Sequence, residues 1–198
     1  MSKVIFDISV SLDGFVTASH TSVDEPMGTG GQRLHEWAFG GDASNRELLE
    51  QALNSVGAII SGRRNYDLAV PWWGPDGPGG PARVPVFVVT HHPPEHSPEG
   101  GVYTFLTGGI DEALTQARAA AGDKDVAVMG GADIGRQFLR AGLLDEISIH
   151  LVPVLFGSGT RLFDDLGPAH IALETVEVVN TPAATHLRYR VRPVTRPG

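Results

Sequence analysis

The sequence predicts an α/β fold built on a largely parallel sheet, with helices on both faces and an antiparallel edge at the C-terminus. Short apolar segments rich in β-branched residues alternate with amphipathic segments of helix length, which is typical of parallel strands joined by helices. The last two apolar segments follow each other with only a short turn between them, which indicates a hairpin. The 198 residues contain no internal repeat and no convincing boundary, so we expect one domain over residues 1–198.

The expected strands are the apolar, β-branched segments. The first is "KVIFDISVSL" (3–12), which ends at the turn signal Asp13-Gly14. The C-terminal hairpin joins residues 172–180 and 185–193 through "NTPAAT". The other expected strands cover residues 56–61, 84–90, 102–106, 125–129 and 146–156.

The expected helices show apolar residues at helical spacing and cover residues 44–55, 109–122 and 133–141. Residues 18–42 are polar and rich in glycine, so we expect mostly loop there. The segment "PWWGPDGPGGP" (71–81) carries so many glycines and prolines that we expect a surface loop or flap.

The inward face of the helix at 44–55 bears on function. Glu47 and Glu50 fall on its solvent side, whereas Asn45 projects inward. An amide can hydrogen-bond a substrate, but it cannot serve as a general acid. The apolar residues expected on the inward face are Leu48, Leu49, Ala52, Leu53 and Val56.

Composition excludes several classes of function. Fifteen basic and 23 acidic residues give a net charge of −8, which argues against a nucleic-acid or anionic-membrane partner. The chain has no cysteine, so disulfides, thiolate zinc sites and cysteine nucleophiles are excluded. The N-terminal segment lacks the long apolar stretch of a signal peptide and no run reaches membrane-spanning length. We therefore expect a cytoplasmic protein.

Four polar or glycine-rich segments follow expected strands: Asp13-Gly14, Gly62-Arg63-Arg64, Thr90-His91-His92 and Gly130-Gly131. Parallel strands end at one edge of the sheet, and ligands bind there. The glycine pair leads into a helix, so it is either a tight turn or bare backbone that lets a phosphate approach the helix N-terminus. The convergence of the four segments favours the phosphate interpretation.

Familiar nucleotide and metal motifs are missing. The pattern G-x-G-x-x-G fails because Arg33 stands where the third glycine belongs, and the only lysines, Lys3 and Lys124, form no P-loop. His91, His92, Glu95 and His96 cluster, but two prolines between them bar the helix that would align metal ligands. We expect no metal site.

The segments "SLDGF", "SGRRNYD", "VVTHHP" and "VMGGADIGRQFLRAGLLDEISIHLVPVLFGSGTRLF" together resemble the dihydrofolate reductase-like superfamily. The most similar branch is the C-terminal reductase domain of the bifunctional riboflavin-biosynthesis deaminase/reductase and its stand-alone relatives. The resemblance covers nearly the whole chain and implies a three-layer fold. It also implies an NADPH-dependent reductase of the 5-amino-6-(5-phosphoribosylamino)uracil reductase type, and a homodimer to which strand 146–156 contributes.

The resemblance implies a cofactor site at this edge of the sheet. Gly130 and Gly131, with the backbone of Ala132, Asp133 and Ile134, would hold the pyrophosphate, although Asp133 is also a candidate helix N-cap. Gly62 would admit the adenosine half, and Arg63 or Arg64 would reach the 2′-phosphate, the alternative being a solvated pair of arginines. Thr90 and His91 would complete the adenosine site.

The resemblance also suggests contacts to a small-molecule substrate. Asp13 and Gly14 would form a loop over the nicotinamide, or a plain Asp-Gly turn. Asn45 faces the pocket, and Trp72 either caps it or pins a long loop. The inward face of helix 44–55 lacks the carboxylate of the folate branch, and Met129 replaces the substrate-binding glutamate of the riboflavin branch. No acid is identifiable in the pocket, so we assign no catalytic residue and expect no folate reduction.

Two other functions remain compatible with the sequence. One is a dihydrofolate reductase-like oxidoreductase that acts on another small heterocycle or a carbonyl. The other is a nucleotide-binding module that has lost turnover.

Overall fold

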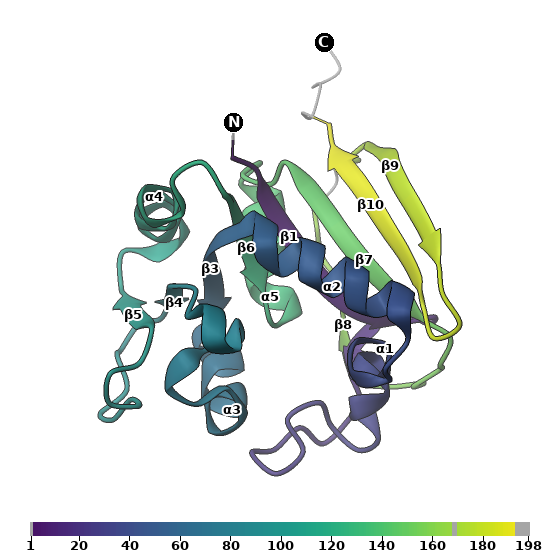
Figure 1. The fold of residues 1–198 in the computed structure, drawn as a ribbon, viewed down its shortest axis with the longest axis horizontal. Helices are drawn as coiled ribbons and strands as arrows, with labels where there is room; N and C mark the ends of the chain where they lie inside the picture. Colours follow the sequence, from purple (N-terminus) through teal and green to yellow (C-terminus); the bar gives the residue numbers. More distant parts are fainter. Residues whose placement is uncertain (1, 168–169, 193–198) are drawn as a thin grey trace.

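The computed structural model describes residues 2–167 and 170–192. The strands of its main sheet are β1 (Val4–Ser11), β3 (Val56–Gly62), β4 (Val86–Val89), β5 (Tyr103–Leu106), β6 (Asp125–Met129), β7 (Glu146–Val152), β9 (Leu173–Asn180) and β10 (Thr185–Val191). They form one 8-stranded sheet in the order β5-β4-β3-β6-β1-β7-β10-β9 (Figure 1).

The strands from β5 to β7 pair in parallel, and β10 pairs antiparallel with both β7 and β9. This confirms the predicted sheet and its C-terminal hairpin. The strand expected at 146–156 ends at Val152 and lies between β1 and β10. Both of its edges are already paired, so it cannot extend the sheet into a second subunit.

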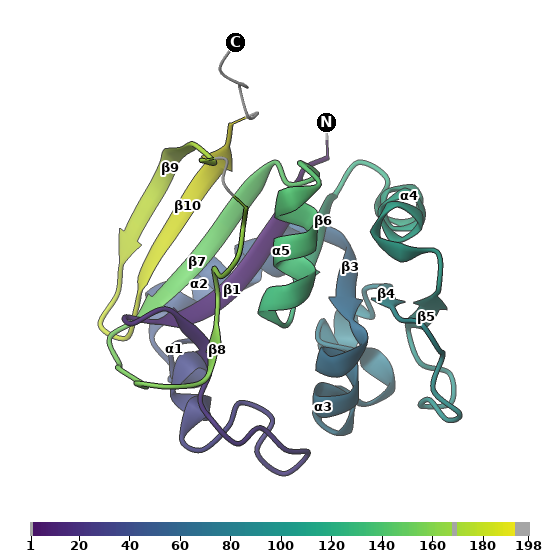
Figure 2. The same cartoon turned by 180° about the vertical axis from the view of Figure 1, so that it is seen from behind.

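Helices cover both faces of the sheet (Figures 1 and 2). One face carries α2 (Ala43–Ser55) and α3 (Arg63–Trp73), and the other carries α4 (Gly109–Ala121) and α5 (Ala132–Arg140). The short helices are η1 (Gly31–His35), α1 (Glu36–Phe39), η2 (Gly74–Asp76) and η3 (Gly80–Ala82). The three layers match a dihydrofolate reductase-like fold.

One loop prediction needs correction, and another holds for most of its length. The expected loop 71–81 begins inside α3, which continues through Pro71 to Trp73, and two short 3-10 helices follow it. Tyr66, only 2% exposed, packs in the core and anchors α3 to the sheet. Residues 18–42 are mostly loop as predicted, except for η1 and α1, which bury Leu34 and Trp37. In both segments tertiary burial outweighs local composition.

The two faces of β1 differ in chemistry. Phe6 and Ile8 join the main apolar core with residues of α4 and α5, whereas Asp7 and Ser9 line a cavity on the α2 side. The sheet face that carries Asp7 and Ser9 is polar, and α2 does not pack tightly on it. Asn45 is its one buried residue among those described, and Leu53 is 37% exposed. Leu48, Leu49 and Ala52 face the cavity, so the inward direction predicted for them is present, whereas the prediction for Leu53 is wrong.

A second, two-stranded sheet pairs β2 (Phe15–Thr17) antiparallel with β8 (Thr160–Arg161). It holds the glycine-rich segment 156–163 beside the loop that follows β1. Across residues 2–167 and 170–192, the helices all fall short of the length and apolar character that crossing a membrane requires.

Candidate functional site

A cavity of about 1990 Å³ extends from the carboxyl ends of β3, β4 and β6 along the sheet beneath α2. Its lining brings together most of the residues that the sequence assigned to a site: Gly62, Arg63, Arg64, Trp72, Thr90, His91, Gly130, Gly131, Ala132, Asp133 and Ile134. Asp13, Gly14 and Asn45 do not line it. Three of the four segments expected at the edge of the parallel sheet therefore meet in one continuous cavity, and Asp13-Gly14 lies outside its lining.

The N-terminus of α5 opens onto this cavity without a side-chain cap. Its N-cap residue is Gly131, with φ 86° and ψ 139°, and no side chain hydrogen-bonds to the cap. Asp133 lies inside the first turn, and its carboxylate accepts a hydrogen bond from Gln137 at 2.7 Å. The alternative assignment of Asp133 as N-cap is therefore wrong. The N–H groups of this turn lack a side-chain partner, as in anion-binding helix termini.

The two glycines before α5 are required for different reasons. Gly130 has φ 73°, and a Cβ there would lie 2.0 Å from Nδ2 of Asn65. Asn65 is itself held by Ser61, to whose Oγ it donates at 3.0 Å. Gly131 also has a positive φ, but a Cβ there would meet nothing within 4 Å. Gly130 is thus fixed by packing, while the open space at Gly131 admits a ligand to the backbone.

The two arginines at the start of α3 point in different directions. Arg63 donates to Asp67 at 2.7 Å, to Oγ1 of Thr90 at 3.5 Å and to the carbonyl of His92. Arg64 donates to Oγ1 of Thr21 at 3.0 Å. Arg63 thus lies against the segment after β4, where an anion would meet both groups. Arg64 lies against the loop before η1.

Asp13 has a structural role that the sequence analysis did not predict. Its carboxylate accepts hydrogen bonds from the Ser11 hydroxyl at 2.6 Å, from Gly157 N–H at 2.7 Å and from Phe156 N–H. The Ser11 hydrogen bond, and then those from Gly157 and Phe156, lower its pKa to about 2 against the opposing effect of desolvation. Asp13 therefore fixes the segment after β7, and Gly14, at φ 89°, completes the turn.

A chain of polar contacts runs from Asp7, His150 and His186, which line the cavity, to Asn45 behind them. Nε2 of His150 lies 3.3 Å from Oδ1 of Asp7, and its Nδ1 lies 2.7 Å from Nδ1 of His186. Nε2 of His186 then lies 3.1 Å from Oδ1 of Asn45 and 3.2 Å from Oγ1 of Thr181. Asn45 projects inward as predicted, but it contacts a histidine rather than the cavity.

Trp37 covers this chain. Its ring centroid is 4.2 Å from that of His150 and 4.9 Å from that of His186, and its indole N–H donates to Ser9 at 2.9 Å. Burial and the charge of His150 lower the pKa of His186 to about 4. The His186 ring is therefore neutral at neutral pH.

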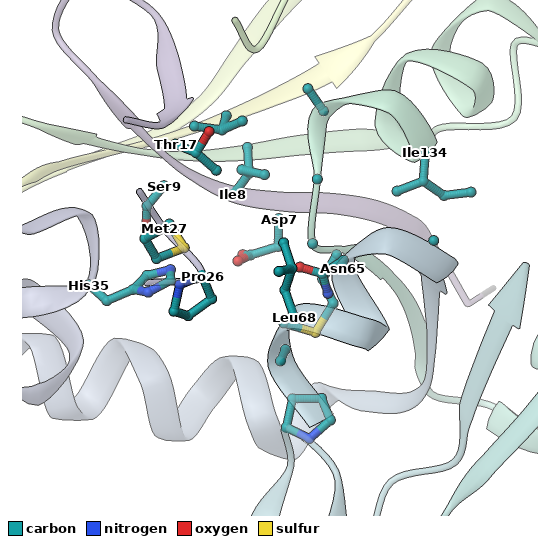
Figure 3. Close-up of a pocket in the computed structure, with 18 of the residues that line it drawn as sticks. Asp7, Ile8, Ser9, Thr17, Pro26, Met27, His35, Asn65, Leu68 and Ile134 are labelled. Atoms are coloured by element: carbon teal, nitrogen blue, oxygen red, sulfur yellow. The ribbon is translucent and has the colours of Figure 1, made fainter. Parts of the chain in front are cut away.

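The side chain of Asp7 places a carboxyl group in the cavity. The sequence analysis did not predict this group. Desolvation opposes its ionisation, but the charge and hydrogen bond of His150, a hydrogen bond from Ser148 and the charge of Arg188 together lower its pKa below 3.8. Figure 3 shows its carboxylate directed into the open space between His35 and Asn65. This finding removes the argument that excluded folate reduction for want of a pocket carboxylate.

The signal that could have found Asp7 is an alternation of polar residues. Asp7, Ser9 and Ser11 recur at every second position of β1, which indicates a polar sheet face. Asp7 contacts His150 on β7, and His150 in turn contacts His186 on β10. In the described part of the chain, no group of three or more histidine, aspartate or glutamate side chains is placed to hold a metal ion.

The residues at the α5 end fit a phosphate-bearing cofactor. Gly131 offers bare backbone, the helix terminus offers uncapped N–H groups, and Arg63 and Thr90 offer a cation and a hydroxyl within one contact of each other. Such donors bind phosphates with charge-assisted hydrogen bonds.

Several proteins are similar to this chain. YyaP of Bacillus subtilis, an uncharacterized protein, is 24% identical over 173 residues, which cover 83% of this chain and 81% of YyaP. A candidate riboflavin biosynthesis protein from Shewanella sp. PV-4 matches in structure with a TM-score of 0.73 and 20% identity, over 96% of this chain and 99% of the other.

Two reductases share the fold. The riboflavin biosynthesis reductase Rib7 of Saccharomyces cerevisiae has a TM-score of 0.62 and 15% identity, over 96% of this chain and 90% of Rib7. Dihydrofolate reductase of Enterococcus faecalis, whose structure is a complex with NADP(H), has a TM-score of 0.57 and 13% identity, over 96% and 97%. The model of the RibD C-terminal domain matches residues 2–187. The chain belongs to the RibD C-terminal domain family.

Proposed function

We propose that this protein is an NADPH-dependent reductase that transfers hydride to a small heterocycle, as the RibD-type reductases do. The observation that carries the proposal is the coincidence, at one end of a single cavity, of the uncapped α5 terminus, the open backbone of Gly131 and the Arg63–Thr90 contact. The neighbouring fold with bound NADP(H) supports the same cofactor.

The proposal assigns each end of the cavity a task. Gly130, Gly131 and the first turn of α5 bind the pyrophosphate, and Gly62 leaves room for the adenosine half. Arg63, which lies against Thr90, receives the 2′-phosphate together with Thr90 and His91, whereas Arg64 lies against Thr21 on the opposite side. The cofactor supplies the hydride, and the protein binds, orients and excludes water. Asp13, Gly14 and Trp72 shape the substrate side from outside or at the rim of the cavity.

The substrate is either the phosphoribosylamino-pyrimidine of riboflavin biosynthesis or another small heterocycle or carbonyl compound. NADPH oxidation measured against a panel of pyrimidines, pterins and carbonyl compounds tests the proposal. We expect turnover with at least one heterocycle and direct binding of NADPH, followed by the fluorescence of its nicotinamide. Binding of NADPH without turnover of any substrate would favour a nucleotide-binding module, and failure to bind NADPH would contradict both.

A further inference from the structure

One residue holds the helix α2 against the sheet. Asn45 is the only buried residue of this helix, at 1% exposure. Its contact with His186 at 3.1 Å is also the only hydrogen bond, among the described residues, that a side chain of α2 makes outside the helix and its cap. No residue of α2 belongs to an apolar cluster of the described core. The helix can therefore move away from the sheet without breaking up a packed core.

The two ends of α2 are attached differently. Ser55, its last residue, is followed directly by Val56, the first residue of β3, and β3 is paired with a strand on each side. The other end follows Gly41, which has φ 78° and open surroundings in which a Cβ would meet nothing within 4 Å. One end is thus fixed in the sheet while the other follows a flexible residue, as in a hinged element.

The space beneath α2 is part of the main cavity. The helix lies across the face of the sheet (Figure 1). Leu48, Leu49 and Ala52 line the cavity from the helix, and Ser148 and Arg188 line it from the sheet. A movement of α2 away from the sheet therefore opens the cavity.

The contact between Asn45 and His186 is satisfied when both histidine rings are neutral. Nδ2 of Asn45 is buried without a partner among the described residues, while its Oδ1 lies beside Nε2 of His186. A half-turn of the amide exchanges the two atoms and gives the buried nitrogen an acceptor. Asn45 then donates to His186, His186 donates to His150, and His150 donates to Asp7.

This chain of contacts accepts one additional proton but not two. With one, the contact between the Nδ1 atoms of His150 and His186 still has a donor and an acceptor. With two, both atoms carry a hydrogen at a separation of 2.7 Å and repel each other. His150 is retained by the carboxylate of Asp7. His186 is therefore the ring that is displaced, and its contact with Asn45 is lost.

Other charged groups around the histidine pair have separate roles. The elements packed around it carry Asp7 on β1, His35 on η1, Glu36 on α1, Asp42 before α2, Glu177 on β9 and Arg188 on β10. Arg188 donates to Glu146 at 2.6 Å, and Asp42 accepts from the N–H of Asn45 as the cap of α2. Burial and the charge of His150 lower the pKa of His35, which favours its neutral form. Among the described residues, Asp7 is the charged group that contacts the pair.

We propose that α2 is a lid over the cavity, hinged where Ser55 meets Val56 and latched by Asn45 on His186, and that a second proton on the histidine pair releases it. The inference concerns access to the cavity and does not depend on the proposed reductase.

Acid favours the open lid because the released His186 binds a proton more tightly than the buried one. Burial and the charge of His150 lower the pKa of His186 from 6.5 to about 4 in the closed state, whereas a solvated ring returns to 6.5. The equilibrium constant for opening should therefore rise by about 60-fold between pH 7 and pH 4.5.

Distances between spin labels test the lid, and the chain has no native cysteine that would interfere. The lid pair is Glu50→Cys on α2 with Ala119→Cys on α4. The reference pair is Ala119→Cys with Ala141→Cys at the end of α5, and all three positions are exposed. Double electron–electron resonance at pH 7 and pH 4.5 gives the distances, with labelled protein diluted in unlabelled protein so that each distance lies within one chain.

The lid pair should give one narrow distance at pH 7 and an additional, longer distance at pH 4.5, while the reference pair stays unchanged. Asn45→Ala removes the latch and should show the longer distance at pH 7. His186→Gln, which offers Asn45 an amide and binds no proton in this range, should stay closed at both pH values. His96→Gln, at an exposed position, should behave like the parent protein.

A single narrow distance for the lid pair of the parent protein at pH 4.5 would overturn the inference, and so would an unchanged distance in Asn45→Ala at pH 7. If Asn45→Ala does not fold, the parent protein at the two pH values decides alone. Movement of the reference pair together with the lid pair would indicate unfolding of the whole domain and would also contradict a local latch.

Discussion

The Nδ1 atoms of His150 and His186 lie 2.7 Å apart, under the ring of Trp37. A hydrogen bond at this distance needs a proton on one nitrogen and a lone pair on the other. The two rings therefore cannot both be imidazolium ions while the contact persists. Because the pair is buried, a second proton can be accommodated only by breaking it.

Acid should destabilise the fold in a window set by His186. Its pKa is about 4 in the folded protein and 6.5 in a free chain, so the unfolded state binds the proton first. The free energy of unfolding should fall as pH drops from about 6.5 to about 4, by about 3 kcal/mol in all. Asp7 and Glu146, with pKa values below 3.8 and 4.5, add to the loss only at lower pH.

Urea unfolding across this pH range measures the effect. His186→Gln should reduce the dependence and leave the part that comes from His35, whose pKa burial also lowers, whereas His96→Gln, at an exposed position after β4, should leave it unchanged. The same slope in His186→Gln as in wild type would assign the acid sensitivity to other groups.

NADPH should bind at least about tenfold more tightly than NADH, because one charge-assisted hydrogen bond contributes roughly 1.5–3 kcal/mol. The difference is the 2′-phosphate, which the acidic protein would repel without local cations. Arg63→Ala combined with Arg64→Ala should remove most of the preference and leave NADH affinity nearly unchanged. Arg118→Ala, on α4 outside the cavity lining, is the control. Calorimetry measures the affinities. Equal affinity of the wild type for NADPH and NADH, or an unchanged preference in the double variant, would indicate that the arginines are a solvated pair without a role in cofactor binding.

Alanine substitutions should separate the roles of the two glycines before α5. Gly131→Ala should cost about 1–3 kcal/mol of stability from its positive φ and also weaken NADPH binding, because the methyl group occupies the open space. Gly122→Ala is the matched control, with φ 61° and equally open surroundings outside the cavity lining, and it should leave NADPH affinity unchanged. Loss of affinity in both variants would indicate a general effect of destabilisation.

Gly130→Ala should be the more damaging change, since the new Cβ also meets Asn65. We expect a loss of about 2–4 kcal/mol from strain and overpacking together. Thermal unfolding of the two variants side by side checks the order, and a Gly130→Ala variant as stable as Gly131→Ala would contradict the packing role of Asn65.

We expect a homodimer that uses the edge strand β9. Val176 and Val178, which are 43% and 57% exposed, lie on a part of the sheet that no helix covers (Figure 2). Burying them against a second copy would remove apolar surface from water. Light scattering should give a dimer at micromolar concentration, and Val176→Lys with Val178→Lys should give a monomer. A wild-type monomer under the same conditions would contradict the expectation.

The sequence predicts strands and helices well where burial follows periodicity, as in β6 and α5. It fails at α3, because the glycines and prolines after Pro71 conceal a helix that Tyr66 anchors in the core. The cofactor end of the cavity was predictable, since the carboxyl ends of parallel strands meet at one edge. The histidine pair was not, because it depends on the antiparallel register that sets His186 opposite His150. No local pattern specifies that register.

Side chains on β1 alternate between an apolar and a polar face, so residues that pack the core and residues that face the cavity occupy different positions of the same strand. Phe6 and Ile8 belong to the core beneath α4 and α5, whereas Asp7 and Ser9 face the loosely covered side. A substitution on the polar face leaves the opposite packing untouched. Ser9 and Ser11 are buried and hold Trp37 and Asp13 by hydrogen bonds, whereas the Asp7 side chain is 39% exposed. Asp7 is therefore the position of β1 at which directed evolution toward other ligands can begin.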